Sequence, residues 1–287
     1  MKHRSSIQLT PGPAFTLVEL LVTMAVFALL IVAVAQLVSS ASVVTKLSQK
    51  HMDADSQARL VFDRMAGDIA KIVKRPDVDY YFQKKSGNDA MFFYSEAPAF
   101  FRTLNAATDA DSVGLIGYRI NPAFQLERLG KQLSWTGSAA ESLPGSMVFS
   151  SVPADGSRLD EVWGQTLADG STDSDYHVLS ESVCRMEICF QKTNGEYVGP
   201  SLTRSLNGYS AIVVALVILD PQSQQITTPS AVAAAFDDPT NDDLSGNSPM
   251  LIAGKWNAKL EAGLSGIPPA AASQIRIYQR HFYLNTK

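Results

Sequence analysis

The most distinct feature of the chain is an uninterrupted apolar run close to its N-terminus. No Asp, Glu, Lys or Arg occurs in residues 20–45, and within residues 20–38 only Thr23 and Gln36 are polar. As a helix with a rise of ~1.5 Å per residue, those nineteen residues would extend about 28 Å. That length is close to the ~30 Å hydrocarbon core of a bilayer. The pattern therefore predicts a membrane-spanning helix.

Helical periodicity continues beyond the apolar run, but on one face only. Apolar residues recur at three- and four-residue steps with polar residues between them, at Val44, Leu47, Ala58, Val61, Met65, Ile69, and Ile72 or Val73. Pro76 is the first proline after this stripe and predicts that the helix ends near Lys74 or Arg75. We expect one helix over residues 15–74, about 90 Å long, with an apolar first half and an amphipathic second half.

Beyond Pro76 the pattern changes to short runs of β-branched and aromatic residues, which predict an antiparallel sheet. Strands are expected at residues 91–95, 113–120, 124–135, 177–191, 209–219 and 275–284. The second and third should form a hairpin. The fourth would place Val178, Ser180, Ser182, Cys184, Met186 and Ile188 on one face.

The run at residues 209–219 has the pattern of a buried central strand. It is almost continuously apolar and is bounded by the turn signals Asn207-Gly208 and Asp220-Pro221. Eleven residues are too few for a second membrane crossing. Residues 136–175 are rich in Gly, Ser, Asp and Pro and predict a long irregular connection.

Helices are predicted before the last strand, at residues 231–236 and 250–264, on either side of an acidic loop at 237–247. They form a helical insertion at about residues 230–265. Residues 270–274 could begin a further helix. The predicted fold class is therefore α+β, with a long N-terminal helix packed on an antiparallel sheet.

The start of the apolar run resembles the class III signal of type IV pilins and type II secretion pseudopilins. A basic leader with Lys2, His3 and Arg4 is followed by the small residue Ala14 and by Phe15-Thr16-Leu17-Val18-Glu19. The resemblance covers about thirty residues. It implies that a prepilin peptidase cuts between Ala14 and Phe15 and methylates the new N-terminus. Family members usually have Gly before the cut, so Ala14 implies slower or less stringent processing.

Glu19 is the residue with the most specific expected role. A carboxylate at this edge of a hydrocarbon core costs roughly 2.5–3.5 kcal/mol on insertion scales. In the family, the acid at this position faces the free amine of a neighbouring subunit's first residue. Such an ion pair offsets the cost of burying both charges, so the resemblance implies that Glu19 acts in assembly.

Further segments resemble the J-type minor pseudopilins of type II secretion. Residues 60–76 form an acid-and-base helix that ends at Arg-Pro, and Tyr118-Arg119-Ile120 is followed by Leu126-Glu127-Arg128-Leu129 in the predicted hairpin. The insertion at residues 230–265 is longer than in a plain J-type subunit. In this respect the chain looks more like the prepilin-type proteins of Verrucomicrobia, the Verru_Chthon cassette group.

The resemblance implies a domain organisation and a location. It gives a leader at 1–14, a transmembrane or filament-core helix at 15–38, an amphipathic helix at 39–75, and a periplasmic pilin-like globular β domain at 76–287. Lys2 and Arg4 favour a cytoplasmic N-terminus, although Lys46 and Lys50 make this bias modest. The family is single-pass in the bacterial inner membrane, with most of the chain in the periplasm.

Two other N-terminal signals explain part of the same pattern. A secretory signal peptide has a core of only ~7–15 residues before a small-x-small site. Ala33-Val34-Ala35 could be such a site, but the apolar run continues to Val38. An uncleaved signal anchor would explain the hydrophobicity and the basic leader, but it leaves Phe15 and Glu19 without a role.

Charge and motifs argue against two function classes. The 287 residues have a net charge of −4, and without residues 1–14 the chain has 22 bases against 28 acids, or −6. A nucleic-acid binder would show a basic face. Common hydrolase, metalloprotease and phosphate-loop motifs do not occur, and the histidines are scattered, at His3, His51, His177 and His281. We expect no enzymatic activity and no resident cofactor.

Acidic clusters and the cysteines raise two further questions. Calcium binds carboxylate and amide oxygens, and such residues gather at Asp237, Asp238, Asn241, Asp242 and Asp243, and at Asp169, Asp173 and Asp175. Neither cluster has EF-hand spacing, so solvated loops are expected, with calcium as the alternative.

Cys184 and Cys189 lie in one predicted strand. In an extended strand they would be ~16 Å apart and would face opposite sides, whereas a disulfide needs Cα atoms ~5.5 Å apart. We expect two small apolar core residues unless a turn intervenes. Two ligands are too few for a metal site.

These features predict a minor pseudopilin or pilin-like structural subunit. It would join other pilin-like subunits through its N-terminal helix, in a type II secretion or type IV pilus-like filament. One alternative is a minor subunit of a true type IV pilus used for adhesion or DNA uptake. The other is a single-pass, membrane-anchored periplasmic enzyme or binding module with a pilin-like anchor.

Overall fold

The computed structural model of the chain describes residues 16–74, 80–84, 87–97, 113–132, 176–199, 206–240 and 251–284. It divides into two compact units, Met1–Gln49 and Lys50–Lys287. The expected leader at residues 1–14 and the irregular connection at 136–175 lie outside the described residues.

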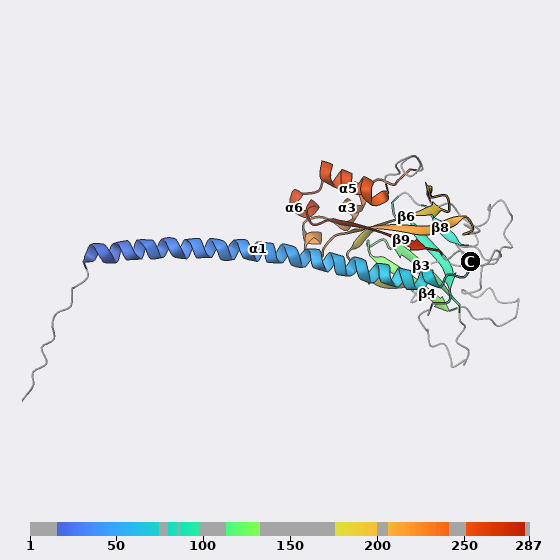
Figure 1. The fold of residues 1–287 in the computed structure, drawn as a ribbon, viewed down its shortest axis with the longest axis horizontal. Coiled ribbons are helices and arrows are strands. Elements are labelled where there is room, and N and C mark those ends of the chain that lie inside the picture. Colours follow the sequence, from blue (N-terminus) through green and yellow to red (C-terminus); the bar gives the residue numbers. More distant parts are fainter. Residues whose placement is uncertain are drawn as a thin grey trace, which may run out of the picture. The chain divides into compact units, whose positions relative to one another are not determined.

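One helix, α1 (Leu17–Ala70), runs through both units (Figure 1). Within the described residues, its segment Leu17–Thr45 is the one helical stretch long and apolar enough to cross a membrane, and no residue of its most apolar window is buried. In the second unit the helix is one-sided, as predicted. Its buried residues are Ala54, Ala58, Val61, Phe62, Met65, Asp68 and Ile69.

The helix ends earlier than the sequence predicted. It stops at Ala70 rather than near Lys74 or Arg75, because the next residues pair with a strand. Ile72 forms a β-bridge to Ser95, and the Val73 N–H donates to the Tyr94 carbonyl at 2.8 Å. Strand pairing therefore ends α1 before Pro76 can.

The first sheet has the strand order β1-β2-β3-β4-β5, and all neighbours are antiparallel. Its strands are β1 (Tyr81–Gln83), β2 (Ala90–Ser95), β3 (Gly114–Ile120), β4 (Leu126–Gln132) and β5 (Tyr176–Ser180). The predicted hairpin is confirmed, since β3 and β4 pair along their whole length. The short strand β1 had no counterpart in the sequence pattern.

The second sheet has the order β7-β6-β8-β9 and is also antiparallel. Its strands are β6 (Val183–Lys192), β7 (Tyr197–Val198), β8 (Tyr209–Ile218) and β9 (Arg276–Tyr283). The predicted central strand is confirmed as β8, which is paired on both sides. Ile212, Val214 and Leu216 enter one core and Val213, Ala215 and Val217 enter another, so β8 shows no polar alternation.

The α+β class is confirmed, but the strands form two sheets rather than one. The predicted strand at residues 177–191 was wrong in its continuity, because it divides into β5 of the first sheet and β6 of the second. The chain turns at Ser182, whose N–H donates to Ser180 Oγ at 3.2 Å and whose carbonyl accepts from the Leu219 N–H at 2.9 Å.

A β-bulge in β6 changes the predicted faces. Val183 pairs with Ile218 and Arg185 with Val217, so Cys184 is the extra residue. The predicted opposite orientation of the cysteines was therefore wrong: both join the core on the same side of the second sheet. They are free thiols, and burial raises the pKa of each to about 12.

Three short helices cover that side of the second sheet (Figure 1). They are α3 (Pro229–Ala235), α5 (Ile252–Ala262) and α6 (Pro269–Ala272), with the 3-10 turn η1 (Ser223–Gln225) before them. Thr228 caps α3 by accepting from the Ala231 N–H at 3.2 Å. The predicted insertion helices are confirmed, and α6 realises the further helix suggested near residues 270–274.

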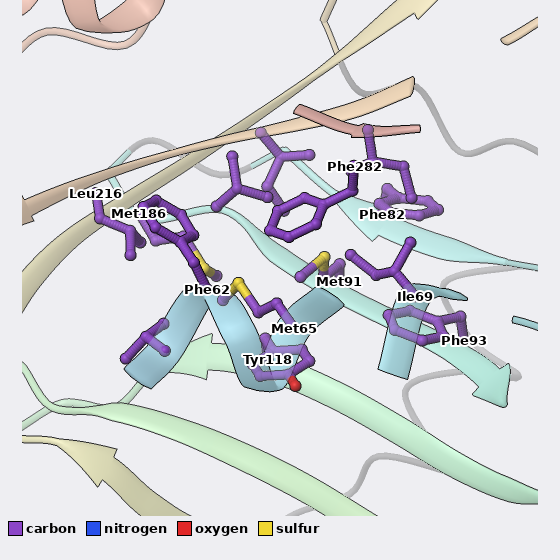
Figure 2. Packing of buried hydrophobic residues seen from close by; sticks show 14 of the residues in the cluster. Phe62, Met65, Ile69, Phe82, Met91, Phe93, Tyr118, Met186, Leu216 and Phe282 are labelled. Atoms are coloured by element: carbon purple, nitrogen blue, oxygen red, sulfur yellow. The ribbon is translucent and has the colours of Figure 1, made fainter. Parts of the chain in front are cut away.

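The main core lies between α1 and the two sheets. Figure 2 shows Phe62 and Met65 of α1 among side chains of β2, β6, β8 and β9. The rings of Phe62 and Phe282 lie 6.1 Å apart between centroids. Burying this helical face against both sheets holds the second unit together.

A buried ion pair fixes the last turns of α1 to the first sheet. The Arg128 guanidinium donates from Nε to Asp68 Oδ2 at 2.6 Å and from Nη2 to Oδ1 at 3.1 Å. The Tyr118 hydroxyl donates to the same Oδ2 at 2.5 Å, and Ser95 Oγ donates to the Asp68 carbonyl at 2.7 Å. All four residues are buried, so each partner offsets the desolvation of the others.

Removing the Arg128 cation should destabilise the attachment of α1 to the first sheet. Arg128→Met leaves the Asp68 carboxylate buried without its bidentate partner, and we expect a loss of about 3–5 kcal/mol of unfolding free energy. Urea unfolding of the full-length protein in detergent measures it. Lys192→Met, which breaks the exposed pair with Glu196, should cost below ~1 kcal/mol.

The double variant Asp68→Leu/Arg128→Met should lose less unfolding free energy than Arg128→Met alone, because it leaves no buried charge without a partner. An equal or greater loss would contradict this account.

Candidate functional site

The N-terminus of α1 is closed by a capping box that contains the predicted assembly residue, Glu19. The backbone N–H and the hydroxyl of Thr16 donate to Glu19 Oε2 at 3.0 and 2.9 Å. In return, the Glu19 N–H donates to Thr16 Oγ1 at 3.3 Å. This reciprocal pattern satisfies two backbone donors at the helix start. Glu19 is thus held by its own subunit.

The capping box leaves Glu19 able to bind a further cation. The side chain is exposed, and both hydrogen bonds that it accepts from Thr16 end on Oε2. A carboxylate offers about four acceptor sites on its two oxygens. An ammonium or guanidinium group can therefore approach Glu19 without displacing Thr16.

Two hydroxyl groups within the apolar segment are satisfied along the helix itself. Thr23 Oγ1 donates to the Leu20 carbonyl at 2.9 Å, and Ser42 Oγ donates to the Val38 carbonyl at 2.8 Å. Such bonds let hydroxyl residues enter a hydrocarbon layer without an unsatisfied donor.

The predicted processing residues Ala14 and Phe15 lie outside the described residues, so cleavage between them stays a prediction. Thr16 is the first residue that the structure describes, and Glu19 lies in the first turn of α1.

In the second unit, the outer face of α1 carries an open groove of about 570 Å³. It is lined by Ser56, Arg59, Leu60, Asp63, Arg64 and Leu179. Leu60 is half exposed, and Leu179 is the lining residue that comes from β5. Sequence periodicity identified the buried face of this helix, but it gave no signal for a groove, because Leu179 is more than a hundred positions away.

A polar seam joins the side of α1 to β9. Asp63 Oδ1 accepts from Arg280 Nη1 at 2.7 Å, Asp55 accepts from the Tyr278 hydroxyl, and His51 contacts the Arg276 guanidinium. His51 and Asp55 of the helix thus contact Arg276 and Tyr278 of the strand. Between these two contacts the helix advances ~6.0 Å and the strand ~6.6 Å, so the two elements stay in step over this part of the seam.

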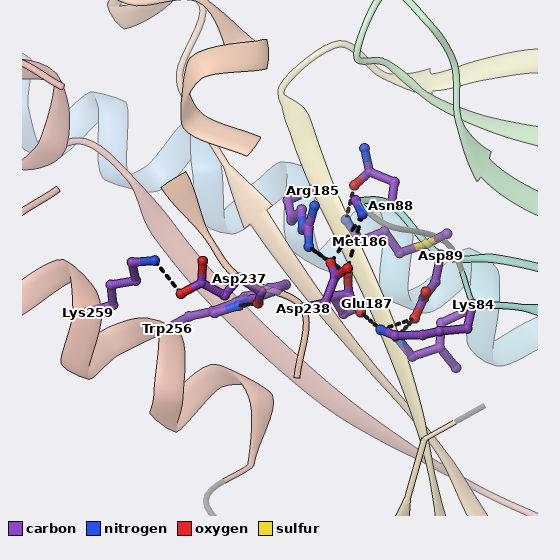
Figure 3. A network of polar contacts seen from close by, with 12 residues as sticks. Lys84, Asn88, Asp89, Arg185, Met186, Glu187, Asp237, Asp238, Trp256 and Lys259 are labelled. Carbon is purple, nitrogen blue, oxygen red and sulfur yellow. Dashed lines mark hydrogen bonds and ion pairs between the residues drawn. The ribbon is translucent and has the colours of Figure 1, made fainter. Parts of the chain in front are cut away.

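The calcium candidates Asp237 and Asp238 point to different cations. Asp237 accepts from Lys259, while Asp238 accepts from Arg185 and from the Gly87 N–H at 3.2 Å (Figure 3). The other two candidates, Asp242 and Asp243, lie outside the described residues. Within the described ranges, no group of three or more acids, histidines or cysteines is placed to hold a metal ion.

The same region contains a buried charge network that sequence reasoning missed. Lys84, next to β1, binds Glu187 of β6 and Asp89, which precedes β2; its distance to Asp89 is 3.3 Å (Figure 3). Glu187 also lies 2.8 Å from Arg185. Burial and the nearby Asp89 raise the pKa of Glu187 to about 9, against the opposing effect of Lys84 and Arg185. The network ties the first sheet to the second.

Comparisons with known proteins gave a structural likeness and no match in sequence. No family model matches the chain, and no curated protein matches it. Among solved structures it is similar to the type IV-like pilin TTHA1219 from Thermus thermophilus, with 14% identity and a TM-score of 0.36. The match covers 81% of this chain and 93% of that chain. A likeness of this size says nothing about function.

Glu187 should make the folded protein less stable as the pH rises. Its carboxyl keeps a proton up to about pH 9 in the folded chain but only to about pH 4.5 in the unfolded chain. The folded state therefore holds more protons in this window, and its stability falls with increasing pH.

Glu187→Gln removes that proton equilibrium. In urea unfolding of the full-length protein between pH 5 and 9, the variant should lose less stability with rising pH than the wild type. Glu261→Gln, on the exposed face of α5, should behave as the wild type. Equal slopes for the wild type and Glu187→Gln would show that the carboxyl is already ionised.

Proposed function

We propose that the chain is a minor pseudopilin or pilin-like subunit that assembles into a type II secretion or type IV pilus-like filament. Before assembly it is held in the bacterial inner membrane, with its N-terminus in the cytoplasm and its second unit in the periplasm. The observation that carries this proposal is Glu19, an exposed acid in the first turn of a helix whose apolar segment has no buried residue in its most apolar window.

The arrangement of α1 supports this proposal. Its segment Leu17–Thr45 is apolar and free to contact lipid or other helices, while its last turns are fixed by the Asp68–Arg128 pair. A simple tether needs only the first property. A subunit drawn into a polymer also needs a rigid connection between the helix and its own globular unit.

The role of Glu19 follows from the cost of its charge. In lipid the carboxylate has Thr16 as its partner among the described residues, whereas an assembled neighbour can supply a cation. Assembly then becomes favourable because it neutralises a charge that the membrane solvates poorly.

Processing at Ala14 gives the first test. Mass spectrometry of the protein from its native cells should show a chain that begins at Phe15 with a methylated amine, because the proposed peptidase removes residues 1–14. An intact Met1 would instead indicate an uncleaved anchor and a tethered periplasmic domain.

Removal of the Glu19 charge gives the second test. Glu19→Gln should insert and be cleaved normally, but its amount in sheared filaments relative to the membrane should fall about tenfold, equivalent to ~1.4 kcal/mol. Glu261→Gln is the matched control, since it removes an exposed acid on α5. Normal recovery of Glu19→Gln in filaments would count against an assembly role for this acid.

A further inference from the structure

The outward face of α1 in the second unit carries a row of six residues, which we name the outer stripe. They are Ser56, Arg59, Leu60, Asp63, Gly67 and Ala70, and all are exposed. Their spacing of three and four positions places them on one side of the helix. The groove described above occupies the first half of this stripe.

Arg59 is the unsatisfied charge of the groove. Asp63 is paired with Arg280 at 2.7 Å, and Arg64 lies 3.8 Å from Asp68. Among the described residues, Arg59 has no hydrogen bond or ion pair. With Leu60 and Leu179 beside it, the groove fits an apolar segment that carries one acid.

Gly67 opens the second half of the stripe. A Cβ built on Gly67 would meet no heavy atom within 4 Å. This position therefore has room for a large side chain from another molecule.

The N-terminal part of α1 carries a second row with the same spacing, which we name the N-terminal stripe. Its residues are Thr16, Glu19, Leu20, Thr23, Phe27 and Leu30, all exposed. Each lies forty positions before a member of the outer stripe.

We propose that the outer stripe of one copy of the chain binds the N-terminal stripe of a second copy, with parallel helices and an offset of forty residues. The proposal rests on the proposed assembly function. In parallel helices, equivalent positions of the two stripes meet directly. The resulting pairs are Thr16–Ser56, Glu19–Arg59, Leu20–Leu60, Thr23–Asp63, Phe27–Gly67 and Leu30–Ala70.

Four of these pairs are chemically matched. Glu19 receives the guanidinium of Arg59, a strong bidentate donor, and its capping box leaves acceptor sites for it. Leu20 adds to the apolar surface of Leu60, and the Phe27 ring fills the open position at Gly67. The Thr23 hydroxyl, which donates to its own Leu20 carbonyl in the single copy, would turn to donate to Asp63 instead.

Charge also selects this register over its neighbours. A slip of one helical turn in either direction, to an offset of 36 or 44 residues, would place Glu19 against Asp55 or Asp63. Either slip sets two carboxylates together, which is unfavourable. Of these three offsets, forty is the one that places a cation opposite Glu19.

The offset implies staggered copies. Forty residues of helix correspond to about 60 Å, so two copies at the same level cannot form these contacts. A staggered array, as in a polymer, can repeat them from copy to copy.

Cysteine crosslinking between two differently tagged full-length copies tests the pairing. One copy carries Leu20→Cys and the other Leu60→Cys, and both are expressed in cells that assemble filaments, which are sheared and oxidised. Cys184 and Cys189 are buried with raised pKa values, so they should contribute little background, which copies without an added cysteine measure. We expect a mixed disulfide dimer.

Variants that change charge or side-chain size then test which contacts bring the two copies together. Arg59→Glu in the Leu60→Cys copy should lower the dimer yield at least tenfold, and Glu19→Arg in the other copy should restore it to within about twofold. Gly67→Trp should also abolish the dimer, while Gly67→Ala should not. Lys71→Glu is the matched charge reversal outside the groove and should have no effect.

Several outcomes would overturn the pairing. If the dimer yield of Arg59→Glu or of Gly67→Trp equals that of Lys71→Glu, the proposed pairing is excluded. It is also excluded if the Leu60→Cys copy forms a crosslink to another protein but never to a second copy of this chain. If Arg59→Glu enters filaments as the wild type does, the pairing is wrong and the assembly function stands. If the wild type itself never enters filaments, both are wrong.

Discussion

The structure depends on one buried acid, Asp68, in the last turns of α1. Its carboxylate is neutralised by Arg128 and receives the Tyr118 hydroxyl, so strands β3 and β4 of the first sheet and the helix α1 are bound at one point. Burial raises the pKa of Tyr118, which keeps its hydroxyl a donor. Breaking such a pair is far more costly than breaking an exposed one. The globular unit and the end of α1 therefore form one body.

A helix fixed at one end gives the other end a different role. Residues 17–45 bury nothing in their most apolar window, yet they carry one acid in their first turn. Lipid suits the apolar side chains and disfavours the acid, whereas a protein environment with a cation suits both. The same segment can thus serve as a membrane anchor first and as a contact between subunits afterwards. The capping box with Thr16 stabilises the Glu19 carboxylate while the segment is in the membrane, and it does not prevent a contact with another subunit later.

The sequence predicted those features that depend on local pattern. The long helix, the β3–β4 hairpin and the central strand β8 all follow from periodicity and turn residues. The division of residues 177–191 did not, because a turn at Ser182 and a bulge at Cys184 interrupt an alternation that looks continuous in one dimension. The early end of α1 depends on pairing with β2, which no local signal encodes.

The site shows the same division. Glu19 could be predicted as a site residue because its neighbours form a recognisable signal, whereas the groove at Arg59 includes a residue of β5 that is far away in the sequence. Likewise, Lys84 and Glu187 are 103 positions apart, and their pairing emerges only from the contact between the two sheets.

The central claim is that the apolar half of α1 moves from lipid to a protein polymer, and the location of the mature chain tests it most directly. Filaments sheared from native cells should contain the chain without residues 1–14, in contact with other pilin-like subunits. Recovery of the whole chain in the membrane fraction alone, with none in the sheared filaments, would contradict the account.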